Sequence, residues 1–62
     1  MVEITRLNMK VAIINAELIE MIEETPDTII TMTTGKKFIV KETKEEMVDK
    51  IIQYRQKILS II

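Results

Sequence analysis

The chain has 62 residues, 47% of them hydrophobic, with a formal net charge of −1 and neither cysteine nor histidine. This composition excludes disulfides, thiolate or imidazole metal ligands, and a global field that would attract nucleic acid. A chain of this length forms one domain, residues 1–62, whose core supplies only about 3–5 kcal/mol, so we expect association with a partner to add stability.

The first elements are two short strands. Alternating branched residues predict a strand over Val2–Leu7 and another over Lys10–Ile14, joined by a two-residue loop at Asn8-Met9. The second loop residue usually requires a positive φ, which glycine adopts at little cost, so Met9 is an unusual choice there. The register of this hairpin therefore stays open.

A helical turn and a third strand follow. Asn15 is a residue type that caps helices, so we expect it to begin a single turn before a strand over Ile19–Glu24. Thr25-Pro26-Asp27-Thr28 then predicts a tight turn, because proline presets φ and aspartate hydrogen-bonds to the nearby backbone.

Two further strands are predicted over residues 29–33 and 36–41, linked through Gly35. An even loop would place Ile29 opposite Val40 and leave both faces half apolar. A three-residue loop with Gly35 in the left-handed region forms a bulge instead. We favour this second register, because it separates apolar from polar side chains. It places Ile30, Met32, Phe38 and Val40 on one face, and Thr31, Thr33, Lys37 and Lys41 on the other.

The last twenty residues predict a helix over about residues 44–62. Thr43 and Glu46 form a capping box, and apolar residues then recur with the period of an α-helix. Strands first and a helix last indicate an α+β fold: a small antiparallel sheet of four to five strands, in two hairpins, followed by one amphipathic C-terminal helix.

This helix carries more apolar surface than one small sheet covers, because its apolar arc spans roughly 180° and a sheet needs little more than 100°. Met47, Ile51, Tyr54 and Ile58 form a first row that is expected to cover the chain's own sheet. The second row is predicted as a self-association interface: Val48, Ile52, Leu59 and Ile62, with Arg55 between the rows. In the alternative, a curved sheet buries both rows within one copy. Arg55 has two interpretations of its own: its planar guanidinium pairs with a carboxylate across the interface, or its stem covers apolar surface while its head reaches water.

No residue pattern indicates a catalytic, cofactor-binding or metal site. Ser60 has no histidine to activate it, and Gly35-Lys36-Lys37 lacks the spacing of a phosphate-binding loop. The acidic residues between positions 17 and 27 are expected to form a solvated edge. Since the N-terminus lacks signal-peptide features and no apolar run approaches about 18 residues, we expect a cytoplasmic protein with no membrane span.

Six short motifs follow one another along the chain: Thr5-Arg6-Leu7-Asn8, Asn15-Ala16-Glu17-Leu18-Ile19-Glu20, Thr25-Pro26-Asp27-Thr28, Gly35-Lys36-Lys37, Val40-Lys41-Glu42 and Tyr54-Arg55. In this order they resemble the small bacterial flagellar protein family FlbD, also known as the swarming motility protein SwrD. The resemblance covers almost the whole chain and departs from the family where Met9 replaces the usual glycine. It implies a short cytoplasmic protein linked with flagellar motor power and swarming, without known catalytic activity.

The positions that match these motifs and are expected to be exposed define a predicted partner surface: Arg6, Asn15, Pro26, Asp27, Lys36 and Lys37. Turns and caps use the same residue types in any protein. The expected partners are a second copy of the chain and a flagellar motor or export component, with no nucleic acid. One alternative is a small RNA-binding dimer resembling carbon-storage regulators, which the opening strand favours and the acidic balance opposes. Another is an enzyme, which would need a cofactor or metal from outside.

Overall fold

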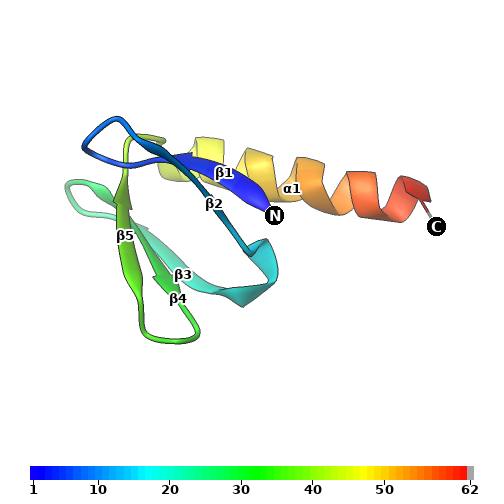
Figure 1. Cartoon of the computed structure of the whole chain (residues 1–62), viewed down its shortest axis with the longest axis horizontal. Coiled ribbons are helices and arrows are strands. Elements are labelled where there is room, and N and C mark those ends of the chain that lie inside the picture. The colour runs from blue at the N-terminus through cyan, green and yellow to red at the C-terminus, as the bar shows by residue number, and fades with distance from the viewer. Residues whose placement is uncertain (62) are drawn as a thin grey trace.

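The computed structural model describes residues 1–61, and the side chains of residues 1–59, as five strands, a 3-10 turn and one helix (Figure 1). In chain order these are β1 (Val2–Thr5), β2 (Val11–Ile14), η1 (Ala16–Leu18), β3 (Ile19–Glu24), β4 (Thr28–Met32), β5 (Lys37–Val40) and α1 (Lys44–Ile61). The α+β fold, with strands first and the helix last, is therefore confirmed.

The strands form two antiparallel sheets, β1–β2 and β3–β4–β5, where the sequence predicted one. η1 turns the chain between β2 and β3, so these two strands do not pair. The sheets still meet where β1 ends, because Arg6 bridges Val40 and the Lys41 N–H donates to the Thr5 carbonyl at 2.8 Å. α1 passes behind the β1–β2 hairpin, contacts β1 and β3, and extends beyond the strands at its far end (Figure 1).

The β4–β5 hairpin has the predicted three-residue loop. Ile30 lies opposite Phe38, and Gly35 has a φ of 92°, which is the left-handed conformation expected of it. Ile30, Met32 and Val40 are buried, and Phe38 packs half-buried against the same core. These pairings confirm the preferred register. The chain adopts it because it turns this apolar face toward the core.

The two-residue loop predicted for the β1–β2 hairpin is wrong. Thr5 lies opposite Val11, which leaves a three-residue loop of Leu7, Asn8 and Met9, with a φ of 68° at Met9. The common two-residue loop needs a positive φ at both central residues, whereas this loop needs it only at Met9. The sequence therefore adopts the register with the smaller backbone strain.

The two hairpin loops have the same hydrogen-bond pattern. In each, one N–H reaches across the base of the loop and a second N–H closes the turn inside it, so Met9 occupies the position that Gly35 holds in the other loop. The bonds are Arg6 N–H to the Lys10 carbonyl at 2.9 Å, Met9 N–H to the Arg6 carbonyl at 2.8 Å, Met32 N–H to the Lys36 carbonyl at 2.8 Å, and Gly35 N–H to the Met32 carbonyl at 2.9 Å.

The predicted caps form as expected. The Asn15 side chain accepts a hydrogen bond from the Glu17 N–H at 3.0 Å and begins η1. At the start of α1, the Glu46 N–H donates to Thr43 Oγ1 at 3.1 Å and the Thr43 N–H donates to Glu46 Oε1 at 2.9 Å. This reciprocal capping box fixes where the helix begins.

The core lies between the two sheets and α1. Met47 of α1 is fully buried in it, Ile51 and Tyr54 pack against it, and Ile58 is 38% exposed because that part of the helix lies beyond the strands. Thr31 was expected on the exposed polar face, but it is only 8% exposed and its hydroxyl has no hydrogen-bond partner. The buried hydrophobic residues are Val2, Ile4, Ile14, Ala16, Ile30, Met32, Val40 and Met47.

Candidate interaction surface

The second row of α1 lies open to solvent. Val48, Ile52 and Leu59 are 48%, 47% and 71% exposed, and Arg55 is exposed with them. The last member of the predicted interface, Ile62, lies outside the described residues. The alternative in which a curved sheet buries both rows is therefore wrong for Val48, Ile52 and Leu59.

Helix geometry explains this exposure. Met47 and Val48 point about 100° apart around the helix axis, so a helix that buries Met47 against the sheets turns Val48 to its side. The later turns of α1 also extend beyond the strands (Figure 1), and Leu59 is the most exposed of the row. The row is thus apolar surface that the sheets of this chain do not reach.

Two shallow hollows border this row. One, of about 320 Å³, has Ile22 of β3 and Val48 in its lining, together with the charged residues Lys44, Glu45 and Asp49. The other, of about 170 Å³, is lined by Glu17, Arg55, Ile58 and Leu59. Among the described residues Arg55 has no ion-pair partner. Apolar side chains framed by charged ones are typical of a surface that contacts protein.

Three of the six predicted partner residues gather at the end of the three-stranded sheet where β4 begins. Arg6 bridges Val40, which lies opposite the first residue of β4. Its guanidinium lies 5.7 Å from the centroid of the Phe38 ring, a favourable cation–π distance. Pro26 and Asp27 form the exposed turn before β4 and line a hollow of about 160 Å³.

The other three lie toward the opposite end of that sheet. Lys36 and Lys37 follow β4 and are exposed. Asn15 belongs to this end because η1 is joined to the β4–β5 loop by the hydrogen bond from the Thr33 N–H to the Leu18 carbonyl at 2.8 Å. The Asn15 side chain is half-buried and serves as a cap. The predicted partner surface is therefore two separate groups and not one patch.

Glu42 joins three parts of the fold, although nothing near it in the sequence marks it as buried. Both of its carboxylate oxygens lie 3.0 Å from the Thr5 N–H that donates to them, and Lys50 Nζ lies 3.4 Å from one of them. Burial alone raises the pKa of the Glu42 carboxyl. The hydrogen bonds from the Thr5 and Glu42 backbones and from Lys50 outweigh burial, so this pKa lies below its ordinary value.

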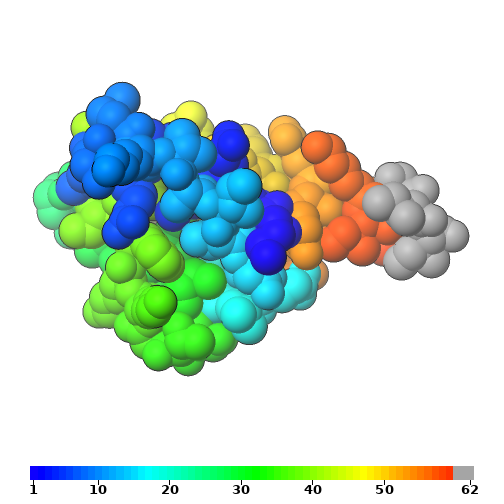
Figure 2. Space-filling model, viewed as in Figure 1, coloured from blue at the N-terminus to red at the C-terminus, as the bar shows by residue number. Residues whose placement is uncertain are grey.

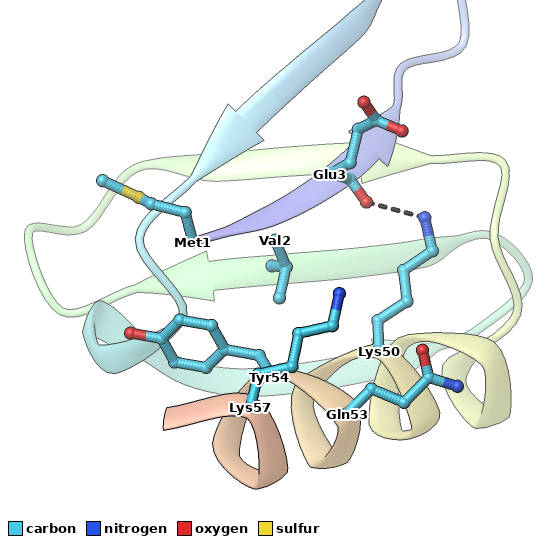
Figure 3. A pocket seen from close by; sticks show the side chains of 7 residues that line it. All are labelled: Met1, Val2, Glu3, Lys50, Gln53, Tyr54 and Lys57. Atoms are coloured by element: carbon cyan, nitrogen blue, oxygen red, sulfur yellow. Dashed lines mark hydrogen bonds between the residues drawn. The ribbon is translucent and has the colours of Figure 1, made fainter. Parts of the chain in front are cut away.

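Lys50 also ties α1 to β1 beside a hollow of about 330 Å³ (Figure 3). Its Nζ donates to the Glu3 carbonyl at 2.8 Å. The described residues hold no group of three acidic, histidine or cysteine side chains that could bind a metal. The lining residues are Met1, Val2, Glu3, Lys50, Gln53, Tyr54 and Lys57. Through the contacts of Glu42 with Thr5 and of Lys50 with Glu3 and Glu42, these two side chains hold β1 against α1.

Within the described part of the chain, α1 is not apolar enough over its length to cross a membrane.

Comparison with known families gives the biological setting. The FlbD family model, described as flagellar and swarming motility proteins, matches residues 1–59. No curated protein and no solved structure matches the chain. Since the matched region contains both sheets and nearly all of α1, the chain belongs to the FlbD family of flagellar and swarming motility proteins.

Proposed function

We propose that this protein is a cytoplasmic, non-enzymatic accessory protein of the bacterial flagellum that supports motor function and swarming by binding other proteins. The family membership supports the motility setting. The observation that carries the mode of action is the second row of α1. Val48, Ile52 and Leu59 remain exposed there, although Met47, Ile51 and Tyr54 of the first row already pack in the core. Exposed apolar rows of this kind bind partner helices or grooves.

The first partner of this row is a second copy of the chain. A small core gains stability when apolar side chains of two copies cover one another. Arg55 favours the same conclusion, because it lies among these apolar residues without an ion-pair partner in the described chain. A carboxylate from the second copy would pair with it through the planar guanidinium. The self-association interface is thus Val48, Ile52, Arg55 and Leu59, with Ile62 beyond the described residues.

The exposed turns serve a second kind of partner, a component of the flagellar motor or export machinery. Pro26 and Asp27 lie at one end of the three-stranded sheet, and Lys36 and Lys37 lie at the other. None of these four lines the hollows beside the α1 row, so pairing of two copies through α1 leaves them accessible.

A complementation experiment tests this proposal. In a strain that lacks the gene, the wild-type protein should restore swarming, and the double variant Val48→Glu/Ile52→Glu should not, although flagella assemble in both strains. Gln53→Glu adds one negative charge, half the change of the double variant, to a different side of α1 and serves as a control, which should restore swarming. Normal swarming without the gene, or full rescue by the folded double variant, would overturn the proposal.

A further inference from the structure

β2 is an unprotected sheet edge. It pairs with β1 on one side, and no other described strand pairs with its second side. Its four residues, Val11, Ala12, Ile13 and Ile14, include no charged side chain and no proline. Proteins usually protect such edges with lysine, proline, a bulge or a covering segment, because unpaired N–H and C=O groups attract another strand.

The register identifies which backbone groups point outward. Residues of antiparallel strands alternate between bonding to the neighbouring strand and pointing away from it. The Arg6 N–H donates to the Lys10 carbonyl at 2.9 Å, so this pair is a bonded one. Counting along the ladder from it, Ala12 bonds to β1, whereas the N–H and C=O groups of Val11 and Ile13 point away.

Contacts of β1 support this assignment. Thr5, which lies opposite Val11, turns its N–H to the Glu42 carboxylate at 3.0 Å and its carbonyl to the Lys41 N–H at 2.8 Å. Glu3, which lies opposite Ile13, turns its carbonyl to Lys50 at 2.8 Å. These outward groups of β1 are satisfied inside the molecule, and the corresponding groups of β2 face solvent.

The same two residues of β2 also expose apolar side chains. Val11 is 58% exposed and Ile13 is 67% exposed, while Ile14 on the other face is buried in the core. In Figure 2 the atoms of β2, in light blue, lie uncovered on the surface toward the viewer. Val11 and Ile13 therefore present unpaired backbone groups and apolar surface together, which is the combination that binds an added strand at a sheet edge.

We propose that β2 pairs with β2 of a second copy and joins the two hairpins into one four-stranded antiparallel sheet. Antiparallel strands side by side are related by a twofold axis perpendicular to the sheet, which keeps each face on its own side. Residues of like face must then lie opposite one another. The register that uses both outward residues places Val11 opposite the partner's Ile13 and Ala12 opposite the partner's Ala12.

The register supports a second copy as the occupant. Val11 lies opposite the partner's Ile13 and Ile13 lies opposite the partner's Val11, so one twofold axis pairs the outward N–H and C=O groups of both residues in both copies. Lys10, the exposed cation that precedes β2, then lies opposite the partner's uncharged Ile14. The apolar side chains of Val11 and Ile13 meet those of the partner, and no like charges lie opposite one another within the strands.

This interface is separate from the α1 row. No residue of β2 lines either hollow beside that row. Two twofold interfaces on different surfaces allow one copy to contact two others, so wild-type protein should assemble beyond a dimer at high concentration. A paired strand of four residues is a small interface, so we expect association to depend strongly on concentration.

Cysteine cross-linking tests the pairing directly, because the chain contains no cysteine. In the proposed register Ala12 and the partner's Ala12 form a pair without hydrogen bonds between them, with Cβ atoms about 4.5–5.5 Å apart, which is within reach of a modestly adjusted disulfide. Ala12→Cys should therefore form a covalent dimer under mild oxidation. Ile39→Cys places a cysteine at an exposed position in β5 and is the matched control, which should form no covalent dimer. Equal rates for both, or a faster rate for Ile13→Cys, would overturn the proposed pairing.

Amide hydrogen exchange gives a second readout on the wild-type protein, so no substitution can disturb the fold. Raising the wild-type concentration from about micromolar to about millimolar should slow exchange at Val11 and Ile13 by about tenfold or more, whereas Ala12, already bonded to β1, changes little. Unchanged exchange at Val11 and Ile13 would refute the pairing. The experiment repeated on Val48→Glu/Ile52→Glu should give the same protection, so failure of the α1 interface and failure of the β2 interface are distinguishable.

Discussion

Replacing Met9 by glycine should stabilise the protein. Met9 has a φ of 68°, a conformation that glycine adopts without strain and other residues adopt at a cost of about 1 kcal/mol. The Met9 side chain is 68% exposed, so its loss removes little buried apolar surface. We therefore expect Met9→Gly to raise the free energy of unfolding by about 1 kcal/mol, which for a domain of this size raises Tm by about 4–8 °C.

The second hairpin supplies the reverse experiment. Gly35 has a φ of 92°, and a Cβ atom added there would meet nothing within 4 Å. Gly35→Ala therefore adds backbone strain without a clash, and it should lower the free energy of unfolding by about 1 kcal/mol. The two loops share one hydrogen-bond pattern. The two variants therefore measure the same quantity, the free-energy cost of a positive φ for a residue other than glycine, with opposite signs.

Urea denaturation at low protein concentration, where association does not contribute, measures both changes at constant m. The denaturation midpoint should rise for Met9→Gly and fall for Gly35→Ala. A midpoint that falls for Met9→Gly would show that the Met9 side chain makes contacts worth more than the strain it imposes, and the reasoning would then be wrong.

Three further measurements follow from the buried polar groups and the helix cap. Glu42→Gln weakens the contacts to Thr5 and Lys50 and should cost about 1–2 kcal/mol near neutral pH. Because the folded pKa of Glu42 lies below its ordinary value of 4.5, its contribution is present above that value and is lost as pH falls through the folded pKa, so the difference between wild type and variant should shrink in acid. Thr31→Val replaces a buried hydroxyl without a partner and should leave the free energy of unfolding unchanged or raise it by about 1 kcal/mol, with a clear decrease counting against the assignment. Thr43→Ala removes the cap of α1 and should lower helix stability by about 1 kcal/mol, measured by circular dichroism during urea denaturation, with Thr33→Ala as an exposed control.

The sequence was sufficient where a structure depends on residues a few positions apart. The capping box at Thr43 and Glu46, the cap at Asn15 and the loop at Gly35 each close through hydrogen bonds between near neighbours. The division of α1 into a packed row and an exposed row followed from helical periodicity in the same way. The exposure of Val48 and Ile52 was therefore predictable from the sequence.

The tertiary structure decided what depends on contacts between distant segments. The loop at Met9 has one residue more than the pattern of Asn8 and Met9 indicated, because the register with one strained φ replaced the register with two. Glu42 and Thr31 look like surface residues in the sequence and became buried because elements remote from them in the chain cover them.

The same distinction applies to the proposed interaction surfaces. Composition, motif order and helical periodicity indicated a small α+β member of a motility family whose helix carries a second apolar row. The predicted strand between them already separates Pro26 and Asp27 from Lys36 and Lys37. Only the assembled fold left the edge of β2 open, since strand neighbours are set by how whole hairpins pack and not by the residues within them. Local order follows from near neighbours, whereas the choice of covered and uncovered edges follows from the long-range packing of the core.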